Sequence, residues 1–432
     1  WLARFWEDAA IDVQGDADSR LALRFNLFHV LQSAGRDPAH GTAAKGLTGE
    51  GYEGHCFWDT EAFVLPVMVF TAPETARAML LYRHRLLDAA RANARELNHA
   101  RGALYPWRTI GGAECSAHYP TGSAAYHINA AIAYAIGLYH DATGDDAFLL
   151  EAGAEMLFET ARIWPQVGHF DPARGGAFGI HGVTGPDEYN VLVDNNFYTN
   201  RMAQRHLQRA VAVWEHLRRT RPQELEALCG RIGLAPEEVR EWARIAAAMQ
   251  LNVDPELDIY AQDDTFLRKP RWPYPPARNG RPLLLDYHPL TIYRHQVAKQ
   301  ADTVMAFVLA GDGLDPVRMR RSFQYYEAVT THDSTLSAAI HGIAAAEFGL
   351  QEKAWRYFSE ALRVDLDDLH HNTAHGVHMA AMAGSWLGLA WGFAGLRVVD
   401  GGLHLAPRLP AAWQGYAFGL HWRGRRLRVE VD

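Results

Sequence analysis

The stretch Gly185-Pro-Asp-Glu-Tyr-Asn190 places two adjacent carboxylates, Asp187 and Glu188, directly after a turn signal. Because Gly-Pro ends any helix or strand that reaches it, we expect these side chains at the tip of a loop. An acid there, flanked by aromatic and amide groups, is suited to delivering a proton to a sugar oxygen. The alternative is a surface turn in which Asp187 or Asp194 caps the helix-like run that opens with Asn195-Asn-Phe-Tyr198. Acidic turns are common, so these residues alone favour the alternative.

Two other segments carry groups that bind sugars. Phe57-Trp-Asp59 sets an aromatic platform beside a carboxylate, and aromatic faces commonly stack on sugars. A core aromatic next to a helix-capping Asp explains this segment equally well. Lys299-Gln300 offers a cation and an amide, but a solvated helix face is the default interpretation of these residues. Neither segment establishes sugar binding by itself.

Hydroxyl and imidazole groups gather in two later segments. In Thr330-Thr-His-Asp-Ser-Thr-Leu-Ser337, hydroxyls ahead of a helix can present O–H and backbone N–H groups to an anion. A helix N-cap at Asp333 or Ser334 is equally consistent with this segment. His370-His-Asn-Thr-Ala-His-Gly-Val-His378 holds four histidines. We expect no metal there, because metal sites usually add carboxylate or thiolate ligands in a fixed geometry and nothing resembles His-Glu-x-x-His. Histidines that line an anion pocket are the favoured interpretation.

These groups supply one clear acid, Glu188, and no equally clear base. Glycoside hydrolysis normally needs two carboxylates that flank the bond, and no Gly-x-Ser-x-Gly nucleophile motif is present. The hydroxyl- and His-rich loops make chemical sense if phosphate attacks the anomeric carbon. Phosphate is already an anionic nucleophile, so it needs positioning rather than deprotonation by a carboxylate.

The composition, 48% apolar and 21% charged, is that of an ordinary soluble protein. A net charge of −8 argues against a general binder of nucleic acids or anionic membranes, and no apolar run approaches the roughly 18 to 20 residues of a membrane helix. Cys56, Cys115 and Cys229 are odd in number and far apart, so a reduced, cytoplasmic setting is expected. No signal peptide is visible at residues 1–6, and the missing initiator Met suggests that the chain begins mid-protein or is processed.

Apolar periodicity predicts about a dozen helices separated by Gly, Pro and polar breaks. The expected helical segments are 7–35, 62–72, 74–98, 124–143, 146–164, 197–219, 236–250, 291–311, 315–329, 334–348, 350–363 and 377–393. We expect loops at 165–190, a Pro-containing connection at 221–236 and a long irregular stretch at 254–290. The Gly-rich segment 46–55 lacks a nucleotide-loop layout and is expected to be a mobile or ligand-facing loop.

Paired helices around a closed ring would gather the long loops at one end, so we expect an (α/α)6 barrel. This catalytic domain would span 1–395, with leading helices at 1–40. After Gly395 the pattern alternates in short strands, 396–399, 403–405, 416–420 and 426–431, which predict a small, shortened C-terminal sheet over 396–432. A helical solenoid is less expected because no constant repeat runs through the chain.

Seven stretches in order resemble the maltose, trehalose and kojibiose phosphorylases, a glycoside-hydrolase family of inverting α-glucoside phosphorylases. Any one of them would be a weak signal, but together they span nearly the whole chain. They are Gly54-His-Cys-Phe-Trp-Asp-Thr-Glu61, Gly102-Ala-Leu-Tyr-Pro-Trp-Arg108, Gly182-Val-Thr-Gly-Pro-Asp-Glu-Tyr189, Asn195-Asn-Phe-Tyr-Thr-Asn200, Lys299-Gln-Ala-Asp302, His332-Asp-Ser-Thr-Leu-Ser337 and Gly376-Val-His-Met-Ala-Ala-Met-Ala-Gly-Ser-Trp386.

The resemblance implies phosphorolysis of an α-glucosidic disaccharide to β-glucose 1-phosphate and an acceptor sugar, with inorganic phosphate as co-substrate and no other cofactor. Glu188 then stands in the position of the general acid. The implied glucosyl-binding residues are Trp58, Asp59, Lys299 and Gln300, with Trp107 and Arg108 as further substrate-binding candidates. The implied phosphate ligands are His332, Ser334, Thr335 and His378.

The resemblance also implies a homodimer, with no nucleic-acid or membrane partner. Members carry an N-terminal β-sandwich domain that is absent from these residues, and the C-terminal sheet looks shortened. Part of the acceptor site or of the dimer surface is therefore expected to lie outside this chain.

Two alternatives remain open. A hydrolase of the same fold, trehalase-like or kojibiose-cleaving, would need a carboxylate base where phosphate otherwise sits, and Glu327, Asp333 and Asp365 are available. A sugar-binding barrel without activity is the second, and an intact Glu188 argues against it. The acceptor sugar stays open among maltose, trehalose, kojibiose and nigerose.

Overall fold

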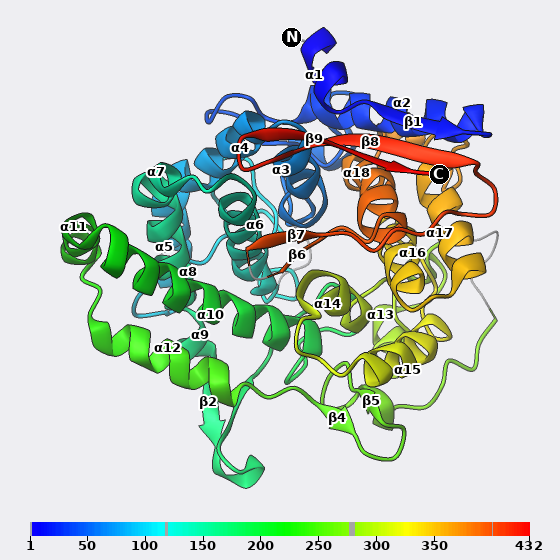
Figure 1. Cartoon of the computed structure of the whole chain (residues 1–432). Coiled ribbons are helices and arrows are strands. Elements are labelled where there is room, and N and C mark those ends of the chain that lie inside the picture. Colours follow the sequence, from blue (N-terminus) through cyan, green and yellow to red (C-terminus); the bar gives the residue numbers. More distant parts are fainter. Residues whose placement is uncertain (1, 117–119, 276–280, 400) are drawn as a thin grey trace.

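The computed structural model describes residues 2–116, 120–275, 281–399 and 401–432. The chain is mainly helical and ends in short strands, as expected (Figure 1). Among the described residues, none of the helices combines the length and apolarity that crossing a bilayer requires.

Six helices pack side by side in a closed series of contacts. Each contacts the next in chain order, and the last contacts the first and the π-helical segment Thr60–Val64 that leads into it. They are α3 (Leu65–Thr71), α6 (His127–Thr143), α10 (Phe197–Thr220), α14 (Thr303–Ala310), α16 (Ser337–Glu347) and α18 (Met379–Leu387). Most are apolar all round, and every residue of α18 is buried. A helix without a polar face is stable only when it is surrounded by protein, which places these helices inside.

Six further helices cover this ring, and most of them contact two of its members. They are α2 (Ala17–Ser33), α4 (Pro73–Arg85), α8 (Ala154–Ala161), α12 (Pro236–Ala248), α15 (Pro316–Glu327) and α17 (Gln351–Arg363). In α17 the buried residues Ala354, Tyr357, Phe358, Ala361 and Leu362 recur at helical spacing. Such an amphipathic stripe buries one face and leaves the other in water.

The remaining helices are short or peripheral. They are α1 (Leu2–Asp8), α5 (Leu87–Glu96), α7 (Asp146–Phe148), α9 (Trp164–Val167), α11 (Pro222–Ile232) and α13 (Pro289–Ile292). In Figure 1, α11 and α12 project at one side of the molecule.

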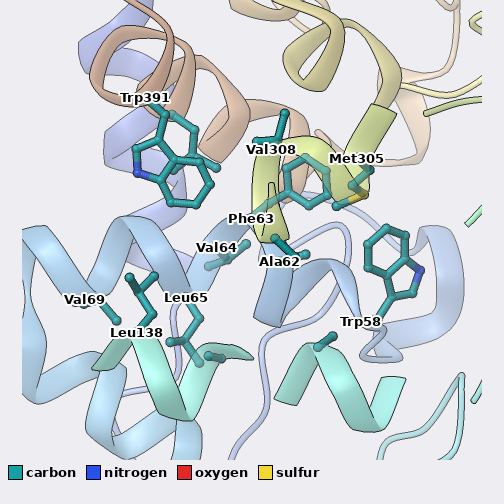
Figure 2. Close-up of a cluster of buried hydrophobic side chains, with 14 of the residues drawn as sticks. Trp58, Ala62, Phe63, Val64, Leu65, Val69, Leu138, Met305, Val308 and Trp391 are labelled. Carbon is teal, nitrogen blue, oxygen red and sulfur yellow. The ribbon is translucent and has the colours of Figure 1, made fainter. Parts of the chain in front are cut away.

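The core is continuous between the ring helices. Figure 2 shows side chains of the π-helical segment, α3, α6 and α14 meeting, with Trp58 and Trp391 on opposite sides of the cluster. Phe63 lies at its centre, wholly buried, with its ring 6.2 Å from that of Trp58. Trp58 therefore joins the packed interior to the segment that carries Asp59.

The C-terminal strands form two sheets, and the larger one includes a strand from the N-terminal part of the chain. β8 (Gly415–Trp422) pairs with β9 (Arg425–Val431) on one side and with β1 (Ile11–Gln14) on the other, both antiparallel. β6 (Arg397–Val399) and β7 (Gly402–His404) form their own hairpin. An N-terminal strand thus completes the main C-terminal sheet.

The prediction of a helix over 7–35 is wrong for its first part, where residues 11–14 form strand β1. Ile11 and Val13 face the interior while Asp12 and Gln14 are more exposed, a period of two that four residues can show within an apparently helical pattern. Gly15, with φ of +87°, then turns the chain, and Asp16 caps α2 by accepting a hydrogen bond from the N–H of Ser19.

Three other segments also differ from expectation. The predicted loop 165–190 contains the hairpin β2 (Gly168–Asp171) and β3 (Ala177–Ile180), and the connection 221–236 contains α11, which begins at a proline. Residues 293–302, expected to be helical, are not. The stretch 254–290 is irregular as predicted, with only β4 (Val253–Asp254), β5 (Ile259–Tyr260) and single turns; its residues 276–280 lie outside the described ones.

Phe63→Ala is expected to lower the free energy of unfolding by about 3 to 5 kcal/mol, because it leaves a cavity in a packed core. Denaturant titration followed by circular dichroism measures the loss. Leu21→Ala, at a side chain that is 69% exposed on α2, is the control and should change stability by less than about 0.5 kcal/mol. Equal effects of the two substitutions would contradict the assignment of Phe63 to the core.

Candidate active site

Five of the six ring helices begin just after a segment that carries candidate residues. Asp59 precedes the π-helical segment, Asn196 precedes α10, and Asp302 precedes α14. The hydroxyl-rich segment ends at α16, and His378 precedes α18. Contacts between these segments, described below, place them at one mouth of the ring. Helix N-termini carry partial positive charge, so this arrangement favours anions.

Asp187 is fully buried and anchors the loop that carries Glu188. Its Oδ1 accepts hydrogen bonds from the backbone N–H groups of Lys299 (2.7 Å) and Tyr189 (3.1 Å). Its Oδ2 accepts from the side-chain amides of Asn190 (2.6 Å) and Gln262 (2.8 Å). Burial raises the pKa of this carboxyl even though the four donors act in the opposite direction. The loop is therefore pinned from both sides, and the predicted alternative of a surface turn is wrong.

A second buried carboxyl, Asp302, backs the same turn. Its Oδ2 accepts the backbone N–H of Asp187 at 3.2 Å, and the amide of Asn196 donates to both of its oxygens. Burial, reinforced by the neighbouring Asp187, raises its pKa well above the usual range. A Cβ on Gly185 would lie 2.3 Å from this carboxyl, so only glycine fits there. Asn196, rather than Asp187 or Asp194, caps α10.

The side chain of Glu188 lies at the mouth, 34% exposed, and pairs with Lys299. The Nζ of Lys299 donates to Oε2 of Glu188 at 2.7 Å. Burial disfavours the lysine charge, but the Glu188 carboxylate outweighs this cost and the pKa of Lys299 is raised. Among the described residues, no donor contacts Oε1 of Glu188, which leaves that oxygen available to a ligand.

Lys299 and Gln300 do not lie on a solvated helix face, so that alternative is also wrong. Their segment runs beside residue 330, with a bridge between Ala298 and Thr330. Gln300 is 4% exposed, and its Nε2 donates to the carbonyl of Pro186 at 2.5 Å. Its Oε1 is buried without a partner among the described residues. An unpaired buried acceptor is costly, so a hydroxyl donor from a ligand would stabilise this site.

Trp58 and Asp59, which the sequence predicted to bind the sugar together, have different surroundings. Trp58 is 4% exposed, and its ring meets those of His127 and Tyr198. Asp59 caps no helix with its side chain. Burial, together with the nearby carboxylates Glu188 and Glu61, raises the pKa of Asp59 to about 7. Trp58 thus packs as a core residue behind a carboxyl group that reaches the mouth.

The Gly-rich segment 46–55 lies beside the candidate residues. Tyr52 and Glu53 both have positive φ, a strained conformation for residues with side chains. The pKa of Tyr52 is raised by burial, and charges on Lys299, Asp59, Glu188 and Arg108 also act on it. Tyr52 therefore lies among the candidate residues, although the sequence did not single it out.

Trp107 and Arg108 border the same mouth. Arg108 donates to Glu53 (3.0 Å), and the ring of Trp107 stands edge-on to Phe57 at 5.2 Å. The backbone N–H of Trp107 is held by Glu114 at 3.0 Å. Arg108 thus holds the Gly-rich segment, and Trp107 packs against the segment that carries Asp59.

The hydroxyl-rich segment adjoins Lys299 through the N–H of Asp333, which donates to the Lys299 carbonyl at 3.0 Å. Neither Asp333 nor Ser334 caps α16 with its side chain, because the N-cap position falls on Leu336. His332 contacts Ser337 through Nδ1 (2.8 Å) and Tyr357 through Nε2 (3.2 Å). Both of its ring nitrogens are engaged within the protein.

His378 belongs to the other predicted anion-binding segment, 370–378. Its Nδ1 is 2.7 Å from Oδ1 of Asp365, and its Nε2 is 2.6 Å from Nζ of Lys45. The pKa of His370 is lowered by burial and by His378, while Asp365 and Asp333 act to raise it. The 370–378 segment is therefore within electrostatic reach of residue 333, which lies in the other predicted anion-binding segment.

The three carboxylates that a hydrolase could use as a base all accept hydrogen bonds from the protein. Asp333 accepts from the hydroxyl of Tyr189 and the N–H of Leu283, both through Oδ2, and no donor among the described residues contacts its Oδ1. Asp365 accepts from the side chain and the backbone N–H of His378. Glu327 is paired in the same way, on the outer helices; its partners are Lys353, Arg356 and Tyr357.

A group with metal-ligand spacing lies away from this mouth, on the C-terminal half of α6. In the described part of the chain, the ligand atoms of His140, Asp146 and His216 are within 4.8 Å of one another, and the histidines of 370–378 form no such group. The Nε2 atoms of His140 and His216 are 2.9 and 3.0 Å from the same oxygen of Asp146. These hydrogen bonds tie α6, α7 and α10 together.

Comparison with protein families identifies the catalytic region. Residues 24–387 match the Glycosyl hydrolase family 65 central catalytic domain, and residues 396–432 match the C-terminal domain of the same family. The first match covers most of the chain and includes all the candidate residues above.

Individual relatives agree with this match. Alpha,alpha-trehalose phosphorylase of Geobacillus stearothermophilus is 49% identical over the whole chain, and maltose phosphorylase of Bacillus subtilis is 37% identical. The chain spans 56% of the length of each. A solved structure described as "Putative kojibiose phosphorylase from human microbiome" superposes with a TM-score of 0.91 at 30% identity, covering 100% of this chain and 59% of that one.

Sugar affinity is expected to depend on the ionisation of Asp59. With a pKa of about 7, this carboxyl is neutral below that pH and then lacks the charge that binds hydroxyl donors strongly. Glucose affinity, measured by tryptophan fluorescence, should fall roughly tenfold per pH unit below about pH 7. In Asp59→Asn this limb should disappear. An unchanged pH profile in that variant would show that another group is responsible.

Proposed function

Because the chain belongs to glycosyl hydrolase family 65, we propose that it is the catalytic part of a disaccharide phosphorylase that uses inorganic phosphate. The observation that carries this proposal is the state of the carboxylates at the mouth. Among the described residues, Glu188 keeps one oxygen free, whereas donors of the protein hold both oxygens of Asp365 and of Glu327. Asp333 accepts two hydrogen bonds through one of its oxygens. Cations, hydroxyls and imidazoles occupy the remaining positions, and these groups suit an anion.

The proposed reaction is a single displacement with inversion. Protonated Glu188 gives its proton to the glycosidic oxygen as the bond from that oxygen to the anomeric carbon breaks. An oxygen of hydrogen phosphate attacks the anomeric carbon from the opposite face, and a phosphate ester forms. The products are β-glucose 1-phosphate and a free acceptor sugar, and Glu188 regains a proton from solvent. Phosphate supplies the negative charge, so no base has to create it.

For the glucosyl unit we propose Asp59, Lys299 and Gln300 as direct ligands. Gln300 supports this role with the unpaired Oε1 described above, and Lys299 with an ammonium that already reaches Glu188. Trp58 contributes the packed wall behind Asp59, Arg108 holds the loop that faces the sugar, and Trp107 packs against the segment that carries Asp59.

For phosphate we propose Ser334, Thr335 and His378. The first two precede α16, whose N-terminus favours an anion, and His378 precedes α18. We leave His332 out of this set because Ser337 and Tyr357 occupy both of its nitrogens. Its role is to hold the hydroxyl-rich segment against α17.

We also propose that the ring and its cover are the (α/α)6 barrel expected from the sequence, with α2, α4, α8, α12, α15 and α17 as the outer layer. The closed series of contacts between ring helices supports this proposal. Among disaccharides we propose α,α-trehalose, since identity is 49% to the trehalose phosphorylase and 37% to the maltose phosphorylase.

Glu188→Gln should lower turnover roughly 10²-fold or more, because the amide cannot protonate the leaving oxygen. Its affinity for the disaccharide should stay close to that of the wild type. Initial rates with saturating sugar and phosphate measure the effect. Glu237→Gln, at an exposed side chain on α12, is the control. Near-normal turnover in Glu188→Gln would refute the assignment of the acid.

Wild-type protein should release glucose 1-phosphate from trehalose faster than from maltose, kojibiose or nigerose, and only when phosphate is present. Enzymatic detection of glucose and of the phosphate ester distinguishes phosphorolysis from hydrolysis. Cleavage at the same rate in phosphate-free buffer would establish a hydrolase. A faster rate on another sugar of the panel would contradict the assignment of trehalose as substrate but not the proposal of a phosphorylase.

A further inference from the structure

Lys45 is a buried ammonium at the edge of the proposed phosphate site. The residue is 3% exposed. Its Nζ lies 3.0 Å from the carbonyl oxygen of Gly376 and 2.6 Å from Nε2 of His378. It also stands 5.9 Å from the ring of Tyr52, which is within electrostatic reach of Glu188 and Lys299. Lys45 is therefore next to both the sugar-facing loop and His378.

These distances fix where the protons lie. A lysine ammonium can only donate, so Nε2 of His378 must accept. Nδ1 then carries the ring hydrogen and donates to Asp365 at 2.7 Å, while the backbone N–H of His378 donates to the other Asp365 oxygen at 2.6 Å. In this tautomer His378 has no N–H left for an anion. The donor that faces the site is Lys45.

The charge on Lys45 has no direct partner. In the part of the chain that the structure describes, no carboxylate lies within ion-pair distance of it, whereas Lys299 and Lys353 each contact a glutamate. Both groups that Lys45 contacts, a carbonyl and an imidazole, are neutral. Burial accordingly lowers its pKa to about 8, although Asp365 acts to raise it. A buried ammonium without a counter-ion is costly, and an anionic ligand would remove that cost.

The use of lysine here is itself selective. The chain has only four lysines among its 42 basic residues, so arginine is its ordinary cation. Lysine presents a compact point charge with three rotatable donors, whereas arginine presents a planar fork. The ammonium of Lys45 can move one hydrogen bond from His378 to a small anion more readily than a planar guanidinium could.

We propose that Lys45 binds the phosphate that attacks the sugar, an inference that rests on the proposed phosphorylase function. On binding, the ammonium turns from Nε2 of His378 to a phosphate oxygen. Nε2, which the amide of Asn372 approaches only at 3.4 Å, then accepts a hydrogen bond from the P–OH group, while Asp365 holds Nδ1–H in place. Lys45 supplies charge, and His378 orients the nucleophile by its P–OH. In the reverse reaction the same pair holds the phosphate of β-glucose 1-phosphate.

The competing explanation is that Lys45 only ties two loops together. The N–H of Val377 donates to Thr48 (2.9 Å), and a Cβ on Gly49 would meet the backbone of Gly376 at 2.5 Å, so the loops also hold together without the ammonium. If Lys45 only held the loops together, its removal would lower stability and weaken the binding of both substrates alike. A phosphate ligand would affect phosphate selectively.

Lys45→Met keeps the buried stem and removes the charge. We expect its KM for phosphate to rise about 10- to 100-fold, the loss typical of a charged hydrogen bond, and its KM for the disaccharide to stay within about threefold of wild type. Phosphate titrated into the sugar-bound protein and followed by calorimetry should show the same loss of affinity without turnover. Lys45→Arg should restore part of the affinity. Lys353→Met, the same substitution on the outer surface, is the control and should leave both constants unchanged.

An unchanged KM for phosphate in Lys45→Met would overturn this role. So would a parallel rise in both KM values with a lowered melting temperature, or no difference between the Met and Arg variants. Failure of the proposed function is read separately, from wild-type protein alone. If the wild type neither binds phosphate nor needs it for cleavage, both proposals fall; if it does both and Lys45→Met behaves like it, only the role of Lys45 falls.

Discussion

The geometry of the mouth depends on the burial of one carboxylate, Asp187. A buried charge persists only when donors surround it, and the donors of Asp187 come from its own loop, from Gln262 and from the backbone of Lys299. Lys299 therefore bonds to the loop twice, through its N–H to Asp187 and through its ammonium to Glu188. Any shift of the loop would leave a buried acceptor unpaired, so the position of Glu188 is fixed by a neighbour that does no chemistry.

The packing of the ring helices brings together candidate segments that lie far apart in the sequence. Most of the inner helices are short and apolar, so they fold only with their neighbours. Since five of the six begin where a candidate segment ends, packing the helices also gathers the segments. That is why seven motifs scattered along the chain can contribute to one site.

Periodicity predicted most helices and the final strands because amphipathic and alternating patterns are local properties of the sequence. It failed where the deciding contact is distant. Residues 11–14 become a strand because β8 lies beside them, and residues 293–302 leave the helical conformation because they pair with residue 330. The acid Glu188 was identified through the order of the motifs. Lys45 and Tyr52 were not, because a lone lysine or tyrosine in a Gly-rich loop carries no periodicity; the scarcity of lysine was the one signal available.

His332 and His378 looked alike in sequence, each beside hydroxyls or other histidines, and their surroundings separate them. His332 is held by a serine and a tyrosine that are themselves buried, and both of its ring nitrogens are engaged within the protein. His378 shares its outward nitrogen with Lys45, whose ammonium can turn to a new acceptor without losing its bond to the Gly376 carbonyl. Only the second arrangement can exchange a protein partner for a ligand at little cost. Whether such a histidine positions a segment or binds a ligand therefore depends on whether its hydrogen-bond partner can move to another acceptor, as Lys45 can.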